Sequence, residues 1–145
     1  MTDELHTLEA KFERLKEQVI HLKNLAGKVK SAEDLKNDFA KEAAAERLFQ
    51  IALEVNLDIG RMIISMENLP RPETNDEIFG VLSKAGIIPQ KYAKKAFGMG
   101  RFRNILVHGY MIVDENRIFE NLQKLSLFAE YTKYISEYIL KKLEK

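Results

Sequence analysis

The sequence predicts an all-α protein, an up-and-down bundle of four to five helices. Apolar residues recur at helical spacing along most of the 145 residues, and no stretch alternates convincingly with the period of a β-strand. The length suits a single domain, residues 1–145, with one hydrophobic core. Apolar residues make up 46% and charged residues 31%, an ordinary globular mixture without a signature of disorder.

The first two long helices are expected from their apolar faces and their end signals. Apolar residues of the first recur at alternating steps of three and four, as Leu5, Leu8, Phe12, Leu15, Val19, Leu22 and Ala26. This heptad seam should pack against another long helix, and Gly27 suits a helix stop. Asn37 or Asp38 can cap the second long helix, which should end near Asn68, before two prolines. This helix is apolar on most sides, so we expect it at the centre of the bundle.

Start signals divide the rest of the chain into three further helices. Thr74 and Glu77 form a capping box that opens a short helix. Pro89 suits the first turn of a helix that should run to about His108. Asp114 can cap a long last helix with a continuous apolar face.

The composition excludes several classes of protein. There is no cysteine, so disulfides, thiolate catalysis and Cys-ligated metal sites are excluded. The three histidines are scattered without ligand spacing, and we expect neither a metal site nor a cofactor. The N-terminal residues are too regularly charged for a signal peptide, and no window approaches the roughly 20 apolar residues that span a bilayer. We therefore expect a cytoplasmic protein without a membrane partner.

Charge is distributed unevenly along the chain. Residues 78–113 contain no Asp or Glu and six basic residues, whereas the other 109 residues hold 17 basic and 22 acidic groups, a net charge of −5. Such a segment attracts a polyanion such as RNA. The RNA-binding residues would then be Lys91, Lys94, Lys95 and Arg101. Alternatively, the segment is a solvated basic face that balances acidic helices elsewhere.

The stretch from Arg103 to Tyr110 contains the candidate catalytic residues. It lies in the acid-free segment, at the expected end of a helix. Asn104 and His108 are four residues apart and share a helical face. The side chain of Arg103 is long enough to cover the roughly 7.5 Å along the helix axis to the histidine. Gly109 permits a sharp turn that could present Tyr110 beside it.

These residue types suit chemistry on a phosphodiester. An arginine can clamp a phosphate and stabilise the charge of a phosphorane. A histidine titrates near neutral pH and can move a proton to or from a ribose hydroxyl. Asn104 could orient the imidazole or hold a phosphate oxygen. The structural alternatives are that His108 caps a helix end and that Tyr110 is a half-buried tyrosine with a hydrogen-bonded hydroxyl.

A polar stripe along the second long helix is a further candidate. Its members recur at helical spacing and are Arg47, Gln50, Glu54, Asp58, Arg61 and Ser65. The stripe is either a solvent face on which Asp58 and Arg61 pair, or the lining of a cleft that faces His108. On the second interpretation Glu54 or Asp58 tunes the histidine, and Arg47 lines the same cleft.

The stretch also resembles the R-x4-H-x-Y signature of HepT toxins, within the HEPN superfamily whose hallmark is R-x(4–6)-H. Arg103, His108 and Tyr110 match the signature, and the Arg-Asn pair and the Leu-Val-His sequence match as well. Residues 45–52 of the second long helix, AERLFQIA, are also similar. The resemblance covers nearly the whole chain.

The resemblance implies a HEPN-like homodimer in which two motifs meet in a cleft at the interface. It implies a metal-independent endoribonuclease that cuts RNA by attack of the 2′-hydroxyl, with Arg103 and His108 catalytic and Asn104 in support. In HepT systems an MNT-type nucleotidyltransferase antitoxin silences the toxin by transferring AMP to the motif tyrosine, here Tyr110. The alternatives are a non-catalytic module that binds RNA or a nucleotide, and a regulatory partner of a nucleotidyltransferase.

Overall fold

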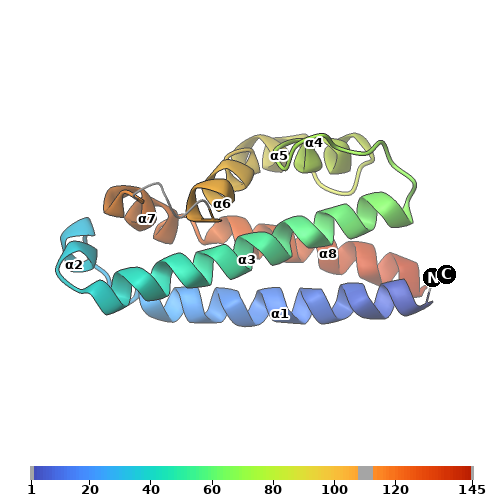
Figure 1. Ribbon diagram of the computed structural model, residues 1–145. Coiled ribbons are helices and arrows are strands. Elements are labelled where there is room, and N and C mark those ends of the chain that lie inside the picture. The colour runs from blue at the N-terminus through green and yellow to red at the C-terminus, as the bar shows by residue number, and fades with distance from the viewer. Residues whose placement is uncertain (1, 108–112, 145) are drawn as a thin grey trace.

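The computed structural model describes residues 2–107 and 113–144 (Figure 1). Its helices are α1 (Thr2–Ala26), α2 (Ala32–Lys36), α3 (Phe39–Met66), α4 (Glu77–Lys84), α5 (Gln90–Ala96), α6 (Met99–Val107), α7 (Glu115–Leu122) and α8 (Ser126–Leu143). No strand occurs in the described ranges, so the all-α prediction is confirmed. None of these helices combines the length and the apolar composition that crossing a bilayer requires.

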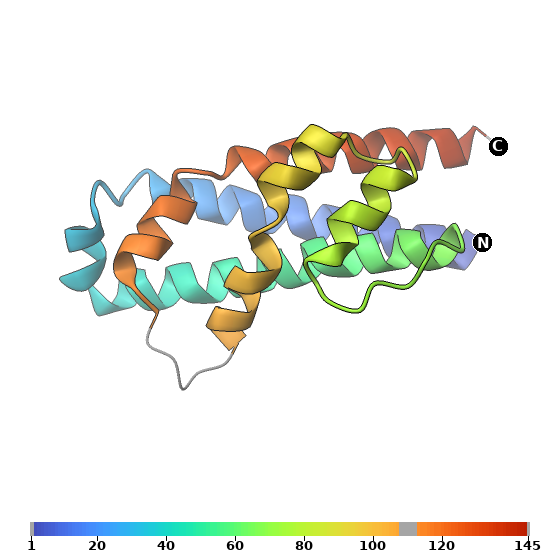
Figure 2. The same ribbon diagram turned by 90° about the horizontal axis from the view of Figure 1, so that it is seen from above.

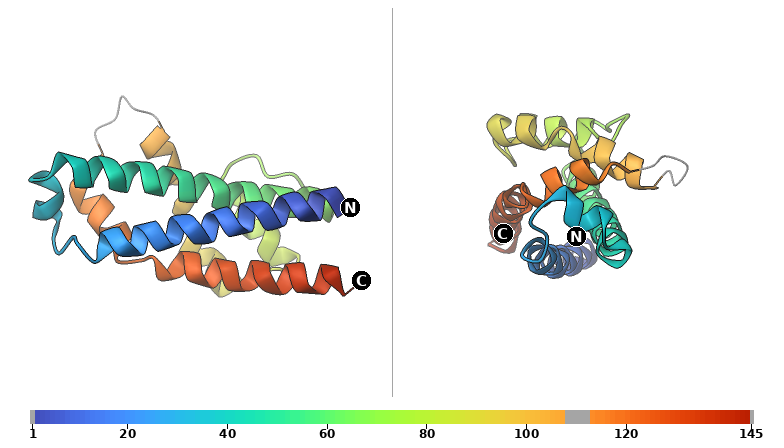
Figure 3. Two further views of the ribbon diagram at one scale, coloured as in Figure 1. Left: turned by 90° about the horizontal axis from the view of Figure 1, so that it is seen from below. Right: turned by 90° about the vertical axis from the view of Figure 1, so that its left-hand side faces the viewer.

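Three long helices form one layer of the molecule. Helix α1 lies between α3 and α8 and is antiparallel to both (Figure 3). From the end of α3 the chain returns to the start of α8 through α4, α5, α6 and α7, which lie together on one side of this layer (Figures 1 and 2). The up-and-down course is therefore confirmed, and its third pass is made of short helices.

Two of the expected helices are each divided in two. The helix expected from Pro89 to His108 consists of α5 and α6, which are separated at Phe97 and Gly98. The helix expected from Asp114 consists of α7 and α8. Apolar residues keep their helical spacing through both breaks, so periodicity did not reveal them, although glycine is a poor helix former. The described residues thus form eight helices rather than four or five.

The helix starts at Asp38 and Asp114 are confirmed, whereas Pro89 precedes the first turn of α5 and α4 begins later than expected. Asp38 caps α3, its carboxylate accepting from the backbone N–H of Lys41 at 3.2 Å, and Asp114 caps α7 in the same way. Glu77 accepts from the backbone N–H of Thr74 at 3.4 Å, as in a capping box. Helix α4 nevertheless begins at Glu77, because the preceding residues form a turn in which the Glu77 N–H donates to the Thr74 carbonyl.

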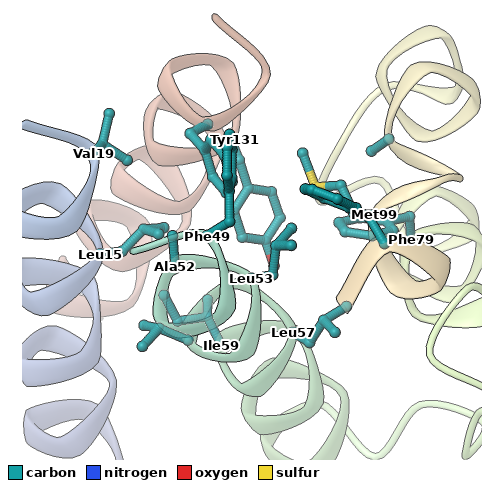
Figure 4. Packing of buried hydrophobic residues seen from close by; sticks show 14 of the residues in the cluster. Leu15, Val19, Phe49, Ala52, Leu53, Leu57, Ile59, Phe79, Met99 and Tyr131 are labelled. Atoms are coloured by element: carbon teal, nitrogen blue, oxygen red, sulfur yellow. The ribbon is translucent and has the colours of Figure 1, made fainter. Parts of the chain in front are cut away.

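Helix α3 occupies the centre of the core, as its composition predicted. Its buried residues point in several directions and are Ala45, Phe49, Ala52, Leu53, Val55, Asn56, Leu57, Ile59, Gly60, Ile63 and Ile64. Figure 4 shows α3 between Leu15 and Val19 of α1 on one side and Met99 of α6 on the other. Each large apolar side chain buried in this way contributes about 1.5–3 kcal/mol to folding.

An aromatic cluster joins the short helices to α8. The rings of Tyr92 and Tyr131 stack with their centroids 6.0 Å apart, and Phe79 meets Tyr131 edge-on at 5.8 Å. The Tyr131 hydroxyl donates to the backbone carbonyl of Asn56 in mid-α3 at 3.1 Å, and the Tyr92 hydroxyl donates to the Leu127 carbonyl at 2.7 Å. Burial raises the pKa of both tyrosines above the ordinary range, so both phenols remain neutral donors.

Gly60 lets α3 approach α4 and α8 closely, and an alanine there should destabilise the fold. A Cβ at this position would lie 2.5 Å from Ile78 Cγ2 and 3.2 Å from the Tyr131 hydroxyl. We expect Gly60→Ala to lower the free energy of unfolding, measured in urea, by about 1–3 kcal/mol despite its better helix propensity.

Gly80 of α4 provides the matched control. A Cβ there would meet nothing within 4 Å in the described part of the fold. Gly80→Ala should therefore raise the free energy of unfolding by about 0.5–1 kcal/mol. If both substitutions stabilised the protein equally, the prediction that a Cβ at Gly60 clashes with Ile78 would be wrong.

Candidate functional site

Helix α6 carries the first residues of the candidate motif across the middle of α3 (Figure 2). The C-terminal end of α6 lies at the α3 side of the bundle, away from α8 (Figure 3). Arg103 and Asn104 are in the described part of the chain and are half-buried. His108 and Tyr110 lie outside the described residues, so the positions proposed for them remain predictions.

Three contacts hold α6 in place. The Phe102 ring packs edge-on against Phe49 of α3 with centroids 5.3 Å apart. Met99 is buried, and its sulfur accepts from the side-chain amide of Asn56 at 3.3 Å. A Cβ at Gly100 would come within 2.7 Å of an Asp76 carboxylate oxygen. The glycine therefore allows the start of α6 to lie directly against the loop that precedes α4.

Arg103 is oriented by two acceptors on two helices. Its Nη2 donates to Oε1 of Glu54 on α3 at 3.3 Å, and its Nη1 donates to Oδ1 of the neighbouring Asn104 at 3.2 Å. The side chain of Arg103 is 28% exposed and that of Glu54 is 39% exposed. The guanidinium is thus held in one direction while most of its N–H groups remain available to a ligand. Asn104 serves the arginine in this arrangement.

A small cleft of about 180 Å³ lies beside Arg103 and the polar stripe on α3. Its lining residues are Glu54, Leu57, Asp58, Arg61 and Arg103. Asp58 and Arg61 are paired at 2.8 Å, as expected for a solvent face, and both also belong to the cleft. The stripe is therefore both a solvent face and part of a cleft, and the expectation that this cleft faces His108 stays a prediction. Arg47 is exposed and is not among the lining residues.

Carboxylates from other elements pair with three of the six basic side chains in residues 78–113, the acid-free segment. The ion pairs are Lys95–Glu130 at 2.7 Å, Arg101–Asp76 at 3.4 Å and Arg103–Glu54 at 3.3 Å. Lys84, Lys91 and Lys94 have no carboxylate within 4 Å in the described part of the chain. Lys84 and Lys94 line a different hollow, bounded by α4, α5 and α8. None of the three lysines of α5 lines the cleft of Arg103.

Acidic residues gather where α7 meets the first turns of α3, a feature that sequence reasoning missed. Burial raises the pKa of Glu46 above its ordinary value, and the negative charges of Glu42 and Glu115 raise it further. Burial and Glu115 likewise raise the pKa of Glu42. This end of α3 repels a polyanion, whereas Arg61 further along α3 and Arg103 of α6 attract one. Only the packing of α7 on α3 brings Glu115 to the other two.

The described residues offer no ready-made metal site. Within residues 2–107 and 113–144, no three His, Asp or Glu side chains are arranged to hold a metal ion.

Comparison with protein families places the chain among ribonucleases. A family model described as "HepT-like: Ribonuclease HepT-like" matches residues 9–135. The chain is 28% identical over 134 residues to a protein named "tRNA nuclease HepT" from Aphanizomenon flos-aquae (strain 2012/KM1/D3). That match covers 92% of this chain and 90% of the relative.

Solved structures share the fold. One is a tri-AMPylated HEPN toxin of Shewanella oneidensis in complex with MNT antitoxin, which has a TM-score of 0.78 and 21% identity and covers 90% of this chain and 96% of that one. Another is YutE of Bacillus subtilis, described as a cytosolic protein of unknown function, with a TM-score of 0.78, 19% identity and 94% coverage of both chains. At these identities the likeness establishes the fold alone.

Proposed function

The chain belongs to the family of HepT-like ribonucleases and is an endoribonuclease, and from this premise we propose that it is the toxin of a toxin–antitoxin pair and cuts RNA without a metal ion. The observation that carries the proposal is the guanidinium of Arg103, which Glu54 and Asn104 hold at a polar cleft. This arginine begins the motif Arg103-x4-His108-x-Tyr110, which lies inside the matched part of the chain.

The proposed reaction is an internal transesterification of the RNA backbone. The ribose 2′-oxygen attacks the adjacent phosphorus, and the bond from phosphorus to the 5′-oxygen of the next nucleotide breaks. His108 takes the proton from the 2′-hydroxyl and returns a proton to the leaving 5′-oxygen. Arg103 stabilises the charge of the phosphorane. The products carry a 2′,3′-cyclic phosphate and a 5′-hydroxyl.

Glu54 has a positioning role in this proposal. An arginine on a flexible stem must be held within a fraction of an ångström of the reacting group to stabilise charge effectively. Glu54 supplies that constraint from α3, the most deeply packed helix. Because the pair is half-exposed, it contributes only about 0–1 kcal/mol to folding. The role of this ion pair is therefore to orient the guanidinium and not to stabilise the fold.

We propose that the active form is a homodimer whose two motifs share one cleft. The end of α6 supports this arrangement, because Val107, the residue of the motif before His108, is an exposed apolar side chain. Covering this end with a second copy would bury the valine and place two copies of Arg103 close together. The antitoxin would be an MNT-type nucleotidyltransferase that transfers AMP to Tyr110, as the tri-AMPylated state of the Shewanella toxin suggests.

Purified protein should cut total RNA in the presence of EDTA and leave cyclic-phosphate ends. His108→Ala and Arg103→Ala, each verified as a folded dimer, should lose at least about 100-fold in rate, the usual contribution of proton transfer or charge stabilisation. Lys133→Gln on α8 should cut like the wild type. Equal cleavage by every preparation would identify a contaminant, and no cleavage by any would favour the non-catalytic alternative.

Glu54→Gln should lower kcat by roughly tenfold, because the guanidinium loses its charged anchor. The free energy of unfolding should change by less than about 1 kcal/mol. Glu130→Gln is the matched control, since it removes the Lys95 pair in the same way and should leave kcat unchanged. Equal rates for both variants would refute the positioning role of Glu54.

Incubation with an MNT-type nucleotidyltransferase, ATP and Mg²⁺ should add AMP to the peptide that contains Tyr110 and abolish cleavage. Tyr110→Phe should cut RNA but stay unmodified in mass spectrometry. Tyr134→Phe removes a half-buried tyrosine of α8 and should still be modified and silenced. AMP found only on peptides that lack Tyr110 would contradict this assignment.

A further inference from the structure

The cleft beside Arg103 contains a second arginine that the proposed reaction does not use. Arg61 lines it from α3, and Arg103 lines it from α6. Glu54 and Asp58 are the carboxylates of the cleft, and Lys11 of α1 lies 3.8 Å from Asp58. The charges of the lining residues therefore balance, and Lys11, which is not a lining residue, adds one positive charge beside them.

Arg61 is oriented in the same manner as Arg103. Its Nη1 donates to Asp58, a neighbour on its own helix, at 2.8 Å, and its Nη2 donates to Oδ1 of Asn75 in the loop before α4. Arg103 likewise has one acceptor nearby in sequence, Asn104, and one on another element. An arginine held in this way loses less conformational entropy when it binds an anion.

The ion pairs within the cleft are open to competition. The side chains of Arg61 and Asp58 are 44% and 46% exposed. Exposed pairs of this kind are weak, so a phosphate oxygen can join or replace a carboxylate at the guanidinium. The cleft volume of about 180 Å³ equals that of roughly six water molecules in the liquid, which leaves room for a phosphate group.

We infer that Arg61 binds a backbone phosphate of single-stranded RNA next to the scissile phosphate that Arg103 holds. This inference rests on the proposed ribonuclease function and extends it to a second subsite. The guanidinium matches a phosphodiester because it can donate two parallel hydrogen bonds to its oxygens. A substrate with a single phosphate cannot use Arg61, whereas a longer RNA can.

RNA binding by a variant without His108 tests the inference independently of cleavage. Affinity for a single-stranded RNA of about ten nucleotides is measured in a His108→Ala background over a range of salt concentrations. Arg61→Gln should weaken binding by roughly tenfold and reduce the slope of log affinity against log salt by about 0.7, the value for one lost phosphate contact. Arg61→Lys, which keeps the charge, should keep the slope. Lys133→Gln removes one positive charge from α8 and should change neither quantity.

Asn75→Ala separates phosphate binding from a purely structural role. This variant breaks the link between Arg61 and the loop but keeps the guanidinium. It should retain the salt slope of the parent protein. If Asn75→Ala reproduced the loss seen with Arg61→Gln, or if Arg61→Gln left the slope unchanged, the phosphate subsite would be refuted.

Cleavage kinetics provide a second test, which distinguishes failure of the phosphate subsite from failure of the ribonuclease mechanism. For a dinucleoside monophosphate, which has only the scissile phosphate, Arg61→Gln and wild type should have equal kcat/KM. For the longer RNA, kcat/KM of the variant should fall by roughly tenfold. An equal loss on both substrates would overturn the subsite. If the wild type cut neither substrate, the ribonuclease mechanism would fail, and the salt slope would still decide whether Arg61 contacts phosphate.

Discussion

The burial of α3 on nearly all of its sides is the constraint on which the rest of the structure depends. A helix with apolar side chains around most of its surface must be covered from every direction. Helix α1 covers it from one side, and the short helices α4, α6 and α7 cover it from the other. Tyr131 of α8 reaches the carbonyl of Asn56 in its middle. The site occupies the remaining strip, where polar residues of α3 emerge beside α6.

A buried asparagine sets the positions of α6 and α8 along α3. Asn56 is completely buried in mid-α3, where its side-chain amide donates to the Met99 sulfur and its backbone carbonyl accepts from the Tyr131 hydroxyl. A shift of α6 or α8 along α3 would break these bonds and leave buried polar groups unpaired, at a cost of about 1–3 kcal/mol each. Apolar contacts alone would tolerate such a shift more easily. The register of α6, and with it the position of Arg103, is thereby specified from inside the core.

The electrostatics of the surface follow from the same packing. The acid-free segment is basic as a sequence, yet Glu54, Asp76 and Glu130 reach it from elsewhere in the fold. In the described part of the chain, the basic side chains of this segment that lack a carboxylate partner are therefore three scattered lysines, Lys84, Lys91 and Lys94. The arginines that face the cleft are held in pairs with carboxylates. A polyanion would meet oriented guanidinium groups at the cleft, which favours recognition of particular phosphates over general attraction.

The sequence by itself determined the features that depend on neighbours three or four residues apart. The helical class, the caps at Asp38 and Asp114, and the polar stripe on α3 all follow from this local spacing. The motif that begins at Arg103 was visible for the same reason, because its residues are contiguous.

Tertiary structure alone decided what joins distant parts of the chain. Glu54 meets Arg103 from 49 residues away, and Asn75 meets Arg61 from 14 residues away. The break between α5 and α6 also depends on tertiary structure, because the apolar spacing continues through it. After the break, Gly100 at the start of α6 lies in close contact with Asp76. Periodicity reports which face of a helix is polar, but the partner of that face depends on how the helices pack.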